Sequence, residues 1–297
     1  MNLKPLVGLI LIGVAASALA QDVLRERAEG FLPLFNGYSV QGWNPGGEVP
    51  WRVVDAALVG DAEARVVESE HNAFSDYVLR FEWRVSAQGQ AALLLRGREF
   101  AFGAVALADR REGSGGMDEL RLRVRKRMDA PAGEWNRMEI RVQRGAAEVR
   151  LNDEVVVANT PVPNLPAQGT IGFQVTSGTL SVRCVRMKPL GLDLAFFVAK
   201  VQPTYKLQCV GCHGGTSNAG RKFPLQVPNL GTYDDGQTLR DYLESARRVR
   251  SGKPDESLLL RKALGQGHGG GKQFAPESPD HRAFLEWING ATLPAVR

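Results

Sequence analysis

Five consecutive residues, Cys209-Val210-Gly211-Cys212-His213, constrain this chain more than any other feature of its sequence. Two cysteines separated by two residues and followed directly by histidine are typical of a c-type haem attachment site. The thiols of Cys209 and Cys212 would add to the haem vinyl groups as thioethers, which makes the cofactor permanent. The imidazole of His213 can bind the iron. The motif therefore predicts one covalent haem c with His213 as proximal ligand.

Two other chemistries use a pair of cysteines at this spacing. A structural zinc site needs a second Cys/Cys or His/His pair at metal spacing, and the sequence contains none. A thioredoxin-like dithiol needs a βαβ setting, which the surrounding pattern does not indicate. Haem is favoured because each competing site lacks a required part.

The sixth iron ligand has few candidates in the sequence. The last methionine, Met187, precedes the motif, and only His268 and His281 follow it. His268 lies in the glycine-rich stretch Gly265–Gly271, where backbone can approach a flat macrocycle closely. His281 lies near the start of an expected helix, where a solvated role is the simpler interpretation. We expect His268 as distal ligand, and an open or water-bound iron is the alternative.

Residues 1–20 have the pattern of a secretory signal peptide. Lys4 supplies a positive n-region, Leu6–Ala15 an apolar h-region, and Ala18–Ala20 a small-residue cleavage site. The apolar run is too short to span a membrane. The pattern predicts cleavage after Ala20 and a periplasmic or secreted protein with no membrane span.

Composition adds weaker limits. Of 37 basic residues, Lys4 leaves with the signal, so 36 basic against 32 acidic side chains give a formal charge of +4. No aromatic-interleaved basic patch occurs, so nucleic acid is not an expected partner. Of three cysteines, Cys184 alone is outside the haem motif, so no disulfide framework is predicted.

Residues 30–190 have the pattern of an all-β domain. In Tyr77–Val85, aromatic and aliphatic residues alternate strictly with Arg80, Glu82 and Arg84. Many such short strands, separated by Gly and Asn turns, predict a sandwich or jelly roll.

Two hairpins are expected within this region. The first joins 148–151 to 155–157 through Asn152-Asp153, and the second joins 170–175 to 180–187 through Ser177-Gly178. Cys184 shares an expected strand face with Leu180 and Val182, which predicts a small buried hydrophobe.

An ordered set of segments over residues 30–190 resembles the 3-keto-disaccharide hydrolase domain family, which has a concanavalin-A-like jelly roll. The segments are Phe31–Gly37, Gly42-Trp43, Trp51–Val54, Phe74–Arg84, Leu93–Arg96, Ala132–Asn136 and Gly169–Phe173. The resemblance implies a domain that acts on keto-sugars by proton abstraction beside the ketone.

The sequence departs from the family where a polar, sugar-facing strand is expected. Ala101, Gly103 and Ala106 occupy the positions of the polar residues. General acid–base chemistry needs a titratable group within reach of the substrate proton. Glu82 and Arg96 remain as weak catalytic candidates, although Glu82 is more simply a solvated cross-strand charge. The departure predicts an eroded or absent hydrolase site.

Three further charged features lie near that strand. Glu99 and Asp109 are neighbouring carboxylates, and Arg96 could pair with Glu82 or anchor a substrate. Leu120–Arg125 would place three arginines on one strand face, as a solvated edge or as a dock for an acidic partner.

Residues 195–293 resemble the cytochrome-c-like domain of planctomycete-type proteins. The resemblance rests on the Cys209 motif, Ser257–Lys262, His268–Gly271 and Trp287-Ile288. It implies a small, mainly α domain after a boundary at Met187–Leu192.

Helix signals agree with that domain. Asp193 is expected to cap a helix over 193–200, 238–250 has helical periodicity, and Asp255 is expected to cap 257–264. Ser278, Pro279 and Gly290 mark the start and stop of a last helix, whose Phe284, Leu285, Trp287 and Ile288 would close the haem pocket.

Together these patterns predict a multidomain protein with a jelly-roll sandwich over 30–190 and a monohaem cytochrome over 195–293. Its expected role is electron transfer with a redox partner protein, joined to a domain that binds carbohydrate. The alternatives are an active 3-keto-glycoside hydrolase with the haem domain as an accessory, and a non-catalytic adhesion module.

Overall fold

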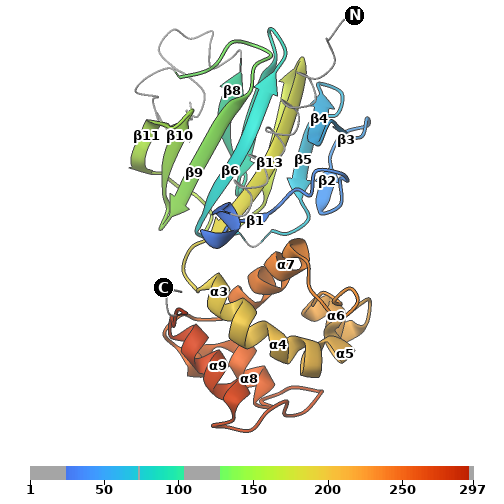
Figure 1. The fold of residues 1–297 in the computed structure, drawn as a ribbon, viewed down its shortest axis with the longest axis vertical. Helices are drawn as coiled ribbons and strands as arrows, with labels where there is room; N and C mark the ends of the chain where they lie inside the picture. Colours follow the sequence, from blue (N-terminus) through green and yellow to red (C-terminus); the bar gives the residue numbers. More distant parts are fainter. Residues whose placement is uncertain (1–24, 73, 104–127, 294–297) are drawn as a thin grey trace, which may run out of the picture.

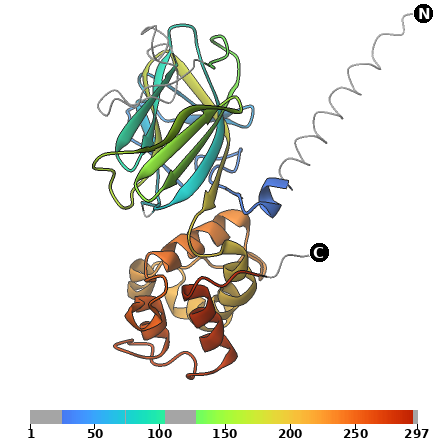
Figure 2. The same ribbon diagram turned by 90° about the vertical axis from the view of Figure 1, so that its left-hand side faces the viewer.

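The computed structural model describes residues 25–72, 74–103 and 128–293 of the chain. A β sandwich forms the first part and a helical region the second, and the two are stacked end to end (Figures 1 and 2). None of the helices in these ranges is both long and apolar enough to cross a bilayer.

The larger sheet has the order β11-β10-β9-β6-β13-β4-β3, with β1 also paired to β13. Neighbouring strands in this sheet run antiparallel. Its strands are β1 (Leu32–Pro33), β3 (Arg52–Val54), β4 (Ala57–Asp61), β6 (Tyr77–Val85), β9 (Asn136–Gln143), β10 (Ala146–Leu151), β11 (Glu154–Pro161) and β13 (Thr179–Pro189).

The smaller sheet has the order β2-β5-β12-β7-β8 and is also antiparallel. Its strands are β2 (Trp43–Pro45), β5 (Val66–Ser69), β7 (Gln90–Leu95), β8 (Arg98–Gly103) and β12 (Ile171–Ser177).

The alternating pattern of β6 explains how the sheets pack. Tyr77, Leu79, Phe81, Trp83 and Val85 are all buried, as their period of two requires. The Phe81 ring meets Phe173 of β12 edge to face, with centroids 5.3 Å apart. The predicted jelly-roll sandwich is confirmed for this part of the chain.

One of the two predicted hairpins is present. β10 and β11 pair across Asn152 and Asp153, whose φ angles of 49° and 70° are those of a tight hairpin turn. The second prediction is wrong. β12 pairs with β5 and β7, whereas β13 pairs with β1, β4 and β6, so the turn at Gly178 carries the chain from one sheet to the other.

The prediction that Cys184 is a buried hydrophobe is also wrong. The pairing of β13 with β6 shifts register between Arg183 and Arg186, and Cys184 has a φ of 52° within that bulge. Val185 therefore takes the inward position, and half-buried Cys184 faces a charged groove.

A nearly continuous helical segment from Leu194 to His213 begins the second part. It comprises α3 (Leu194–Phe196), the π-helical turn η2 (Phe197–Val201), α4 (Gln202–Thr204), the π-helical turn η3 (Tyr205–Cys209) and α5 (Val210–His213). Then follow α6 (Asn218–Lys222), α7 (Asp235–Ala246), the 3₁₀ turn η4 (Pro254–Glu256), α8 (Leu258–Ala263) and α9 (Pro279–Ile288).

The predicted caps Asp193 and Ser278 are confirmed, whereas the helix predicted over 193–200 continues to His213 and the one predicted over 238–250 is α7. The Asp193 carboxylate accepts a hydrogen bond from Phe196 N, and the Ser278 hydroxyl accepts one from His281 N at 3.2 Å. Asp255 does not cap α8. It lies in η4, and Ser257 occupies the N-cap position.

The centre of the helical core is aromatic. The Phe197 ring lies 5.1 Å from Trp287 and 5.6 Å from Tyr242, measured between centroids. Trp287 and Ile288 are fully buried, and the Trp287 Nε1–H donates to the Asp193 carbonyl oxygen at 2.9 Å. The last helix is thus tied to the first.

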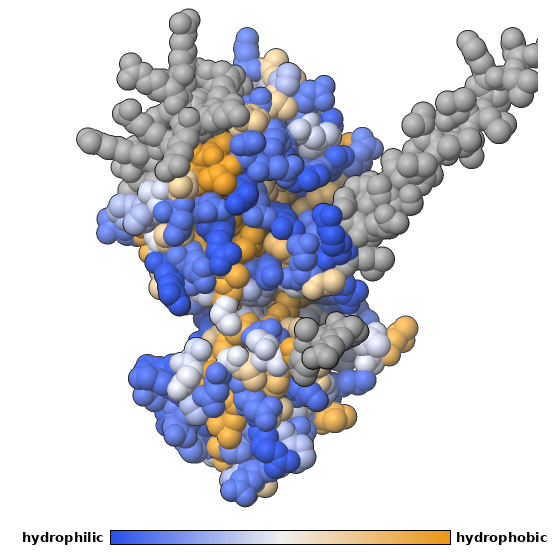
Figure 3. Space-filling model, turned by 60° about the vertical axis from the view of Figure 1, so that its left-hand side comes forward, coloured by the Kyte–Doolittle hydropathy of each residue, from blue (hydrophilic) through white to orange (hydrophobic). Residues whose placement is uncertain are grey.

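Specific contacts join the two parts. β13 ends at Pro189, inside the predicted boundary, and the Tyr242 hydroxyl donates to the Leu192 carbonyl oxygen at 2.6 Å. Arg27 pairs with Asp235 at 2.8 Å, and His71 Nδ1 lies 3.5 Å from Glu244 Oε1. The space-filling view shows a narrowing of the molecule between the two parts (Figure 3).

Candidate functional site

The Cys209–His213 motif lies at the end of the Leu194–His213 helical segment. Residues three and four apart lie on the same face of a helix, so Cys209, Cys212 and His213 point to one side. Cys209 is half-buried, Cys212 is exposed, and both are free thiols. The fold therefore presents the two thiols and the imidazole together.

The His213 and His268 rings face each other across this side of the domain. Their centroids are 5.9 Å apart and their planes differ by 10°. Metal–imidazole bonds are about 2 Å long, so one ion between two ring nitrogens leaves the ring centres about 6 Å apart. This spacing would suit two histidine ligands of one metal ion.

Hydrogen bonds fix which nitrogen of each ring is available. His213 Nδ1 lies 3.1 Å from the Ala219 carbonyl oxygen, and His268 Nδ1 lies 2.7 Å from that of Gly271. A carbonyl oxygen only accepts, so each Nδ1 carries the proton and each Nε2 keeps a lone pair. Such carbonyl contacts orient metal-binding histidines in many proteins.

The glycine-rich loop allows His268 to reach this position. Gly265, Gly267 and Gly271 have φ angles of 89°, 60° and 74°, which residues with a side chain rarely adopt. His281 lies elsewhere, in the first turn of α9, where its Nδ1 accepts a hydrogen bond from Glu277 N at 2.9 Å. The structure brings His268 to His213, and His281 keeps a structural contact.

Three large aliphatic side chains around the motif are exposed. Leu207, Val227 and Leu230 have exposed fractions of 79%, 55% and 106%. The Lys206 ammonium donates to the Gly231 carbonyl oxygen, which holds the 227–231 loop beside the motif helix. The described part of the chain has no cluster of three or more His, Cys, Asp or Glu that could hold a metal ion. The exposed aliphatic side chains beside the two histidines would suit a flat, apolar cofactor.

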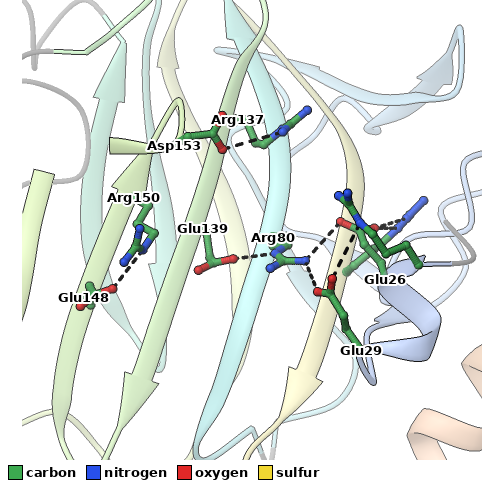
Figure 4. A network of polar contacts seen from close by, with 10 residues as sticks. Glu26, Glu29, Arg80, Arg137, Glu139, Glu148, Arg150 and Asp153 are labelled. Carbon is green, nitrogen blue, oxygen red and sulfur yellow. Dashed lines mark hydrogen bonds and ion pairs between the residues drawn. The ribbon is translucent and has the colours of Figure 1, made fainter. Parts of the chain in front are cut away.

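The sandwich has its own candidate site, a groove of about 510 Å³ on the outer face of the larger sheet. Arginines and carboxylates from neighbouring strands and from residues 25–29 line it (Figure 4). Arg80 binds Glu139 at 2.6 Å and Glu29 at 3.0 Å, and Arg186 binds Glu26 at 2.9 Å. The groove is therefore filled with paired charges.

Glu82 and Arg96, the predicted catalytic candidates, lie far apart in the fold. Glu82 lines the groove and accepts from Arg183 Nε at 2.7 Å, while Arg183 stacks on the Trp135 ring at 4.0 Å. Arg96 is buried beyond the end of β7, where it donates to the Pro166 carbonyl oxygen and lies 3.7 Å from Asp76. Sequence separation alone did not reveal that Glu82 lies in the larger sheet whereas Arg96 follows a strand of the smaller one.

The register of the smaller sheet shows what replaces the expected polar strand. Ala101 pairs with Ala92 and Gly103 pairs with Gln90, while Phe100 points into the core. Ala106, Asp109 and Leu120–Arg125 lie outside the described residues. On this sheet Glu99 is exposed, and Glu68 Oε1 accepts from Thr170 Oγ1 at 2.6 Å.

The profile of the 3-keto-α-glucoside-1,2-lyase-like domain family matches residues 30–188, more than half of the chain. The chain belongs to this family. The resemblance to keto-disaccharide hydrolases over residues 30–190 is thereby confirmed.

Several solved structures are similar to part of this chain. A proposed glycosyl hydrolase from Parabacteroides distasonis is 19% identical, with a TM-score of 0.47, and the match covers 56% of this chain and 97% of that chain. A carbohydrate-binding module from Bacillus subtilis is 14% identical, with a TM-score of 0.35, over 50% of this chain and 95% of that one. No curated protein sequence matches the chain.

The lyase-like match ends at residue 188, before the helical region. The cytochrome-c resemblance of that region thus remains a prediction carried by its own residues. Sequence reasoning missed the charged groove, although the outward arginines and glutamates of β6 and β9 were a signal for it. It also missed a buried carboxylate, Asp241, which helical periodicity alone would not have singled out.

Proposed function

We propose that this protein is an exported monohaem c-type cytochrome fused to a carbohydrate-binding, 3-keto-α-glucoside-1,2-lyase-like domain. Cys209 and Cys212 attach the haem, His213 is the proximal ligand and His268 the distal ligand. The observation that carries the proposal is the parallel His213–His268 pair, at 5.9 Å, beside the two thiols.

When bound, the haem supplies one-electron transfer. The chain's residues hold and orient it. The Ala219 and Gly271 carbonyl oxygens keep the protons on Nδ1, which leaves both Nε2 atoms as donors to the iron. Leu207, Val227 and Leu230 would cover its apolar surface and lose their exposure to water.

A spectrum of the protein made in a host that matures cytochromes c tests the ligand pair. The wild type should be low-spin with two imidazole ligands, and His268→Ala should convert the iron to high spin and admit small ligands. The matched variant His281→Ala should keep the wild-type spectrum, because His281 contacts Glu277 and not His213. A methionine–iron charge-transfer band, or an unchanged spectrum of His268→Ala, would contradict the assignment.

Export is part of the proposal, because thioether attachment takes place outside the cytoplasm. The mature chain should begin at Gln21, after the Ala18–Ala20 cleavage site. Amino-terminal sequencing of protein from the periplasmic fraction tests this. Protein that starts at Met1 in that fraction would show that the segment is not removed.

A second function, turnover of 3-keto-disaccharides, is favoured by the family match over residues 30–188. The site argues against high activity, since Glu82 is held by Arg183 and Ala101 and Gly103 replace the expected polar residues. A positioned acid or base contributes about 10²–10⁴-fold to such reactions. We expect turnover at least about a hundredfold below that of an enzyme with an intact pair.

Incubation with 3-keto-disaccharides, followed by measurement of the released sugars, checks this expectation. Glu82→Gln should leave any residual turnover unchanged, as should Glu148→Gln, which removes another carboxylate of the same groove. Robust turnover that is lost only in Glu82→Gln would establish the hydrolytic function and place its base at Glu82.

A further inference from the structure

One titratable side chain of the helical region lies in the core and has no role in holding the haem. Asp241, in the middle of α7, has no exposed surface. Its Oδ1 accepts a hydrogen bond from Gln226 N at 2.8 Å, and its Oδ2 is buried without a hydrogen-bond partner. A fully ionised carboxylate in such a place is costly, so this group favours its protonated form.

The same backbone segment connects Asp241 to the proximal ligand. Leu225 N donates to the His213 carbonyl oxygen at 3.2 Å, and the next amide, Gln226 N, donates to Asp241. Two consecutive N–H groups therefore bond the haem motif and the buried carboxylate. The haem motif and the buried carboxylate are thus held by adjacent amides of one short segment.

Among the charged groups near Asp241, Arg240 favours the ionised carboxylate and Glu244 opposes it. Gln202 from α4 and the hydroxyl-bearing ring of Tyr233 lie near it, and the Tyr233 hydroxyl is also buried without a partner. Tyr205 and Cys209 approach from η3, and the charged groups nearby are Arg240, Glu244 and Arg248. Glu244 already binds Arg247 and Arg248, so those two cations are engaged.

Burial is the dominant effect on this group and raises the pKa of the Asp241 carboxyl to about 7. It is therefore partly protonated at neutral pH. The protonation state of a group whose pKa is close to the ambient pH changes in response to a small change in the local electric field.

We infer that Asp241 is a proton-exchanging group coupled to the redox state of the haem, so that electron transfer by this protein is accompanied by partial proton release and uptake. The inference rests on the proposed function, since it requires the haem.

The balance of the step is simple. Reduced haem iron gives one electron to an external one-electron acceptor, and the iron centre gains one positive charge. That charge favours the ionised carboxylate, so the Asp241 carboxylic acid loses its proton to water. Reduction returns one electron to the iron and one proton to the carboxylate. Linkage then requires the potential to fall as pH rises through the pKa of this group.

A spectroelectrochemical titration of the haem-loaded protein between pH 5 and pH 9 tests the coupling. A tenfold difference in proton affinity between the two redox states corresponds to a fall of about 59 mV across the range. In Asp241→Asn, which keeps an oxygen for Gln226 N, the pH dependence should disappear. Glu256→Gln, an exposed carboxylate paired with Arg250 and Lys253, should retain it.

A flat wild-type titration would overturn the inference, and so would an unchanged slope in Asp241→Asn, which would assign the proton to another group such as a haem propionate. If Asp241→Asn does not fold, a redox-difference infrared spectrum of the wild type decides instead. A carboxylic acid band that is lost on oxidation supports the coupling, and its absence refutes it. A colourless protein would instead show that the proposed function itself has failed.

Discussion

Replacing Cys209 and Cys212 together with alanine is expected to abolish covalent haem completely. The two thiols and His213 lie on one face of the Leu194–His213 helical segment, and they are the attachment chemistry that the motif supplies. In the wild type, haem should remain with the chain in denaturing gel electrophoresis and survive acid–acetone extraction. In the double variant, neither should hold.

Cys184 is the matched control for this experiment. It is the third cysteine of the chain, and it lies in the bulge of β13, facing the charged groove of the sandwich. Cys184→Ala should keep all of the covalent haem. Haem that survives in the double variant, or is lost in Cys184→Ala, would contradict the attachment site, and a colourless wild type would contradict the cofactor.

Acidification between pH 6.5 and pH 4 is expected to destabilise the protein through His71. This side chain is 12% exposed at the junction of the two parts, with Nδ1 facing Glu244 and a buried Nε2 that has no hydrogen-bond partner. The pKa of His71 is lowered from 6.5 to about 4, mainly by burial; Glu244 opposes this fall, and the cations of Arg247, Arg240 and Arg248 contribute to it.

The sign follows from which state binds the proton. Below pH 6.5 the unfolded chain protonates His71, whereas the folded protein keeps it neutral until about pH 4. The contribution of His71 to the free energy of unfolding is therefore fully present above pH 6.5. It is lost as pH falls through this window, by up to about 3 kcal/mol at pH 4. Denaturant unfolding at several pH values measures it.

His71→Gln isolates the contribution, because glutamine does not titrate. The variant should lose less stability than the wild type between pH 6.5 and pH 4. Asp241 acts in the opposite direction, since its raised pKa costs stability as pH rises from 4 to 7, and the comparison of variants at each pH removes its effect. His281→Gln, which changes a histidine outside the junction, should follow the wild type. If the free energy of unfolding falls with pH by the same amount in the wild type and in His71→Gln, His71 is not the group responsible.

The sequence by itself determined the features that depend on short-range chemistry. The period-two pattern of Tyr77–Val85 specified a strand with one buried face, because successive side chains of a strand alternate between its two faces. Ser278, Pro279 and Gly290 specified a helix and its ends, because caps act over a few residues. The spacing of Cys209, Cys212 and His213 placed them on one helical face for the same reason.

Only the tertiary structure decided which distant segments meet. The register shift at Cys184 turned a predicted core residue toward a charged groove, since a slip of one residue reverses the face of every side chain beyond it. Glu82 and Arg96 have suitable chemistry but lie apart, because sheet assignment depends on strand pairing over long range. His268 reached His213, and Asp241 became a fully buried acid, through packing of separate helices and loops. Local residue patterns do not predict such contacts, because the energies of these contacts arise only when the whole chain has folded.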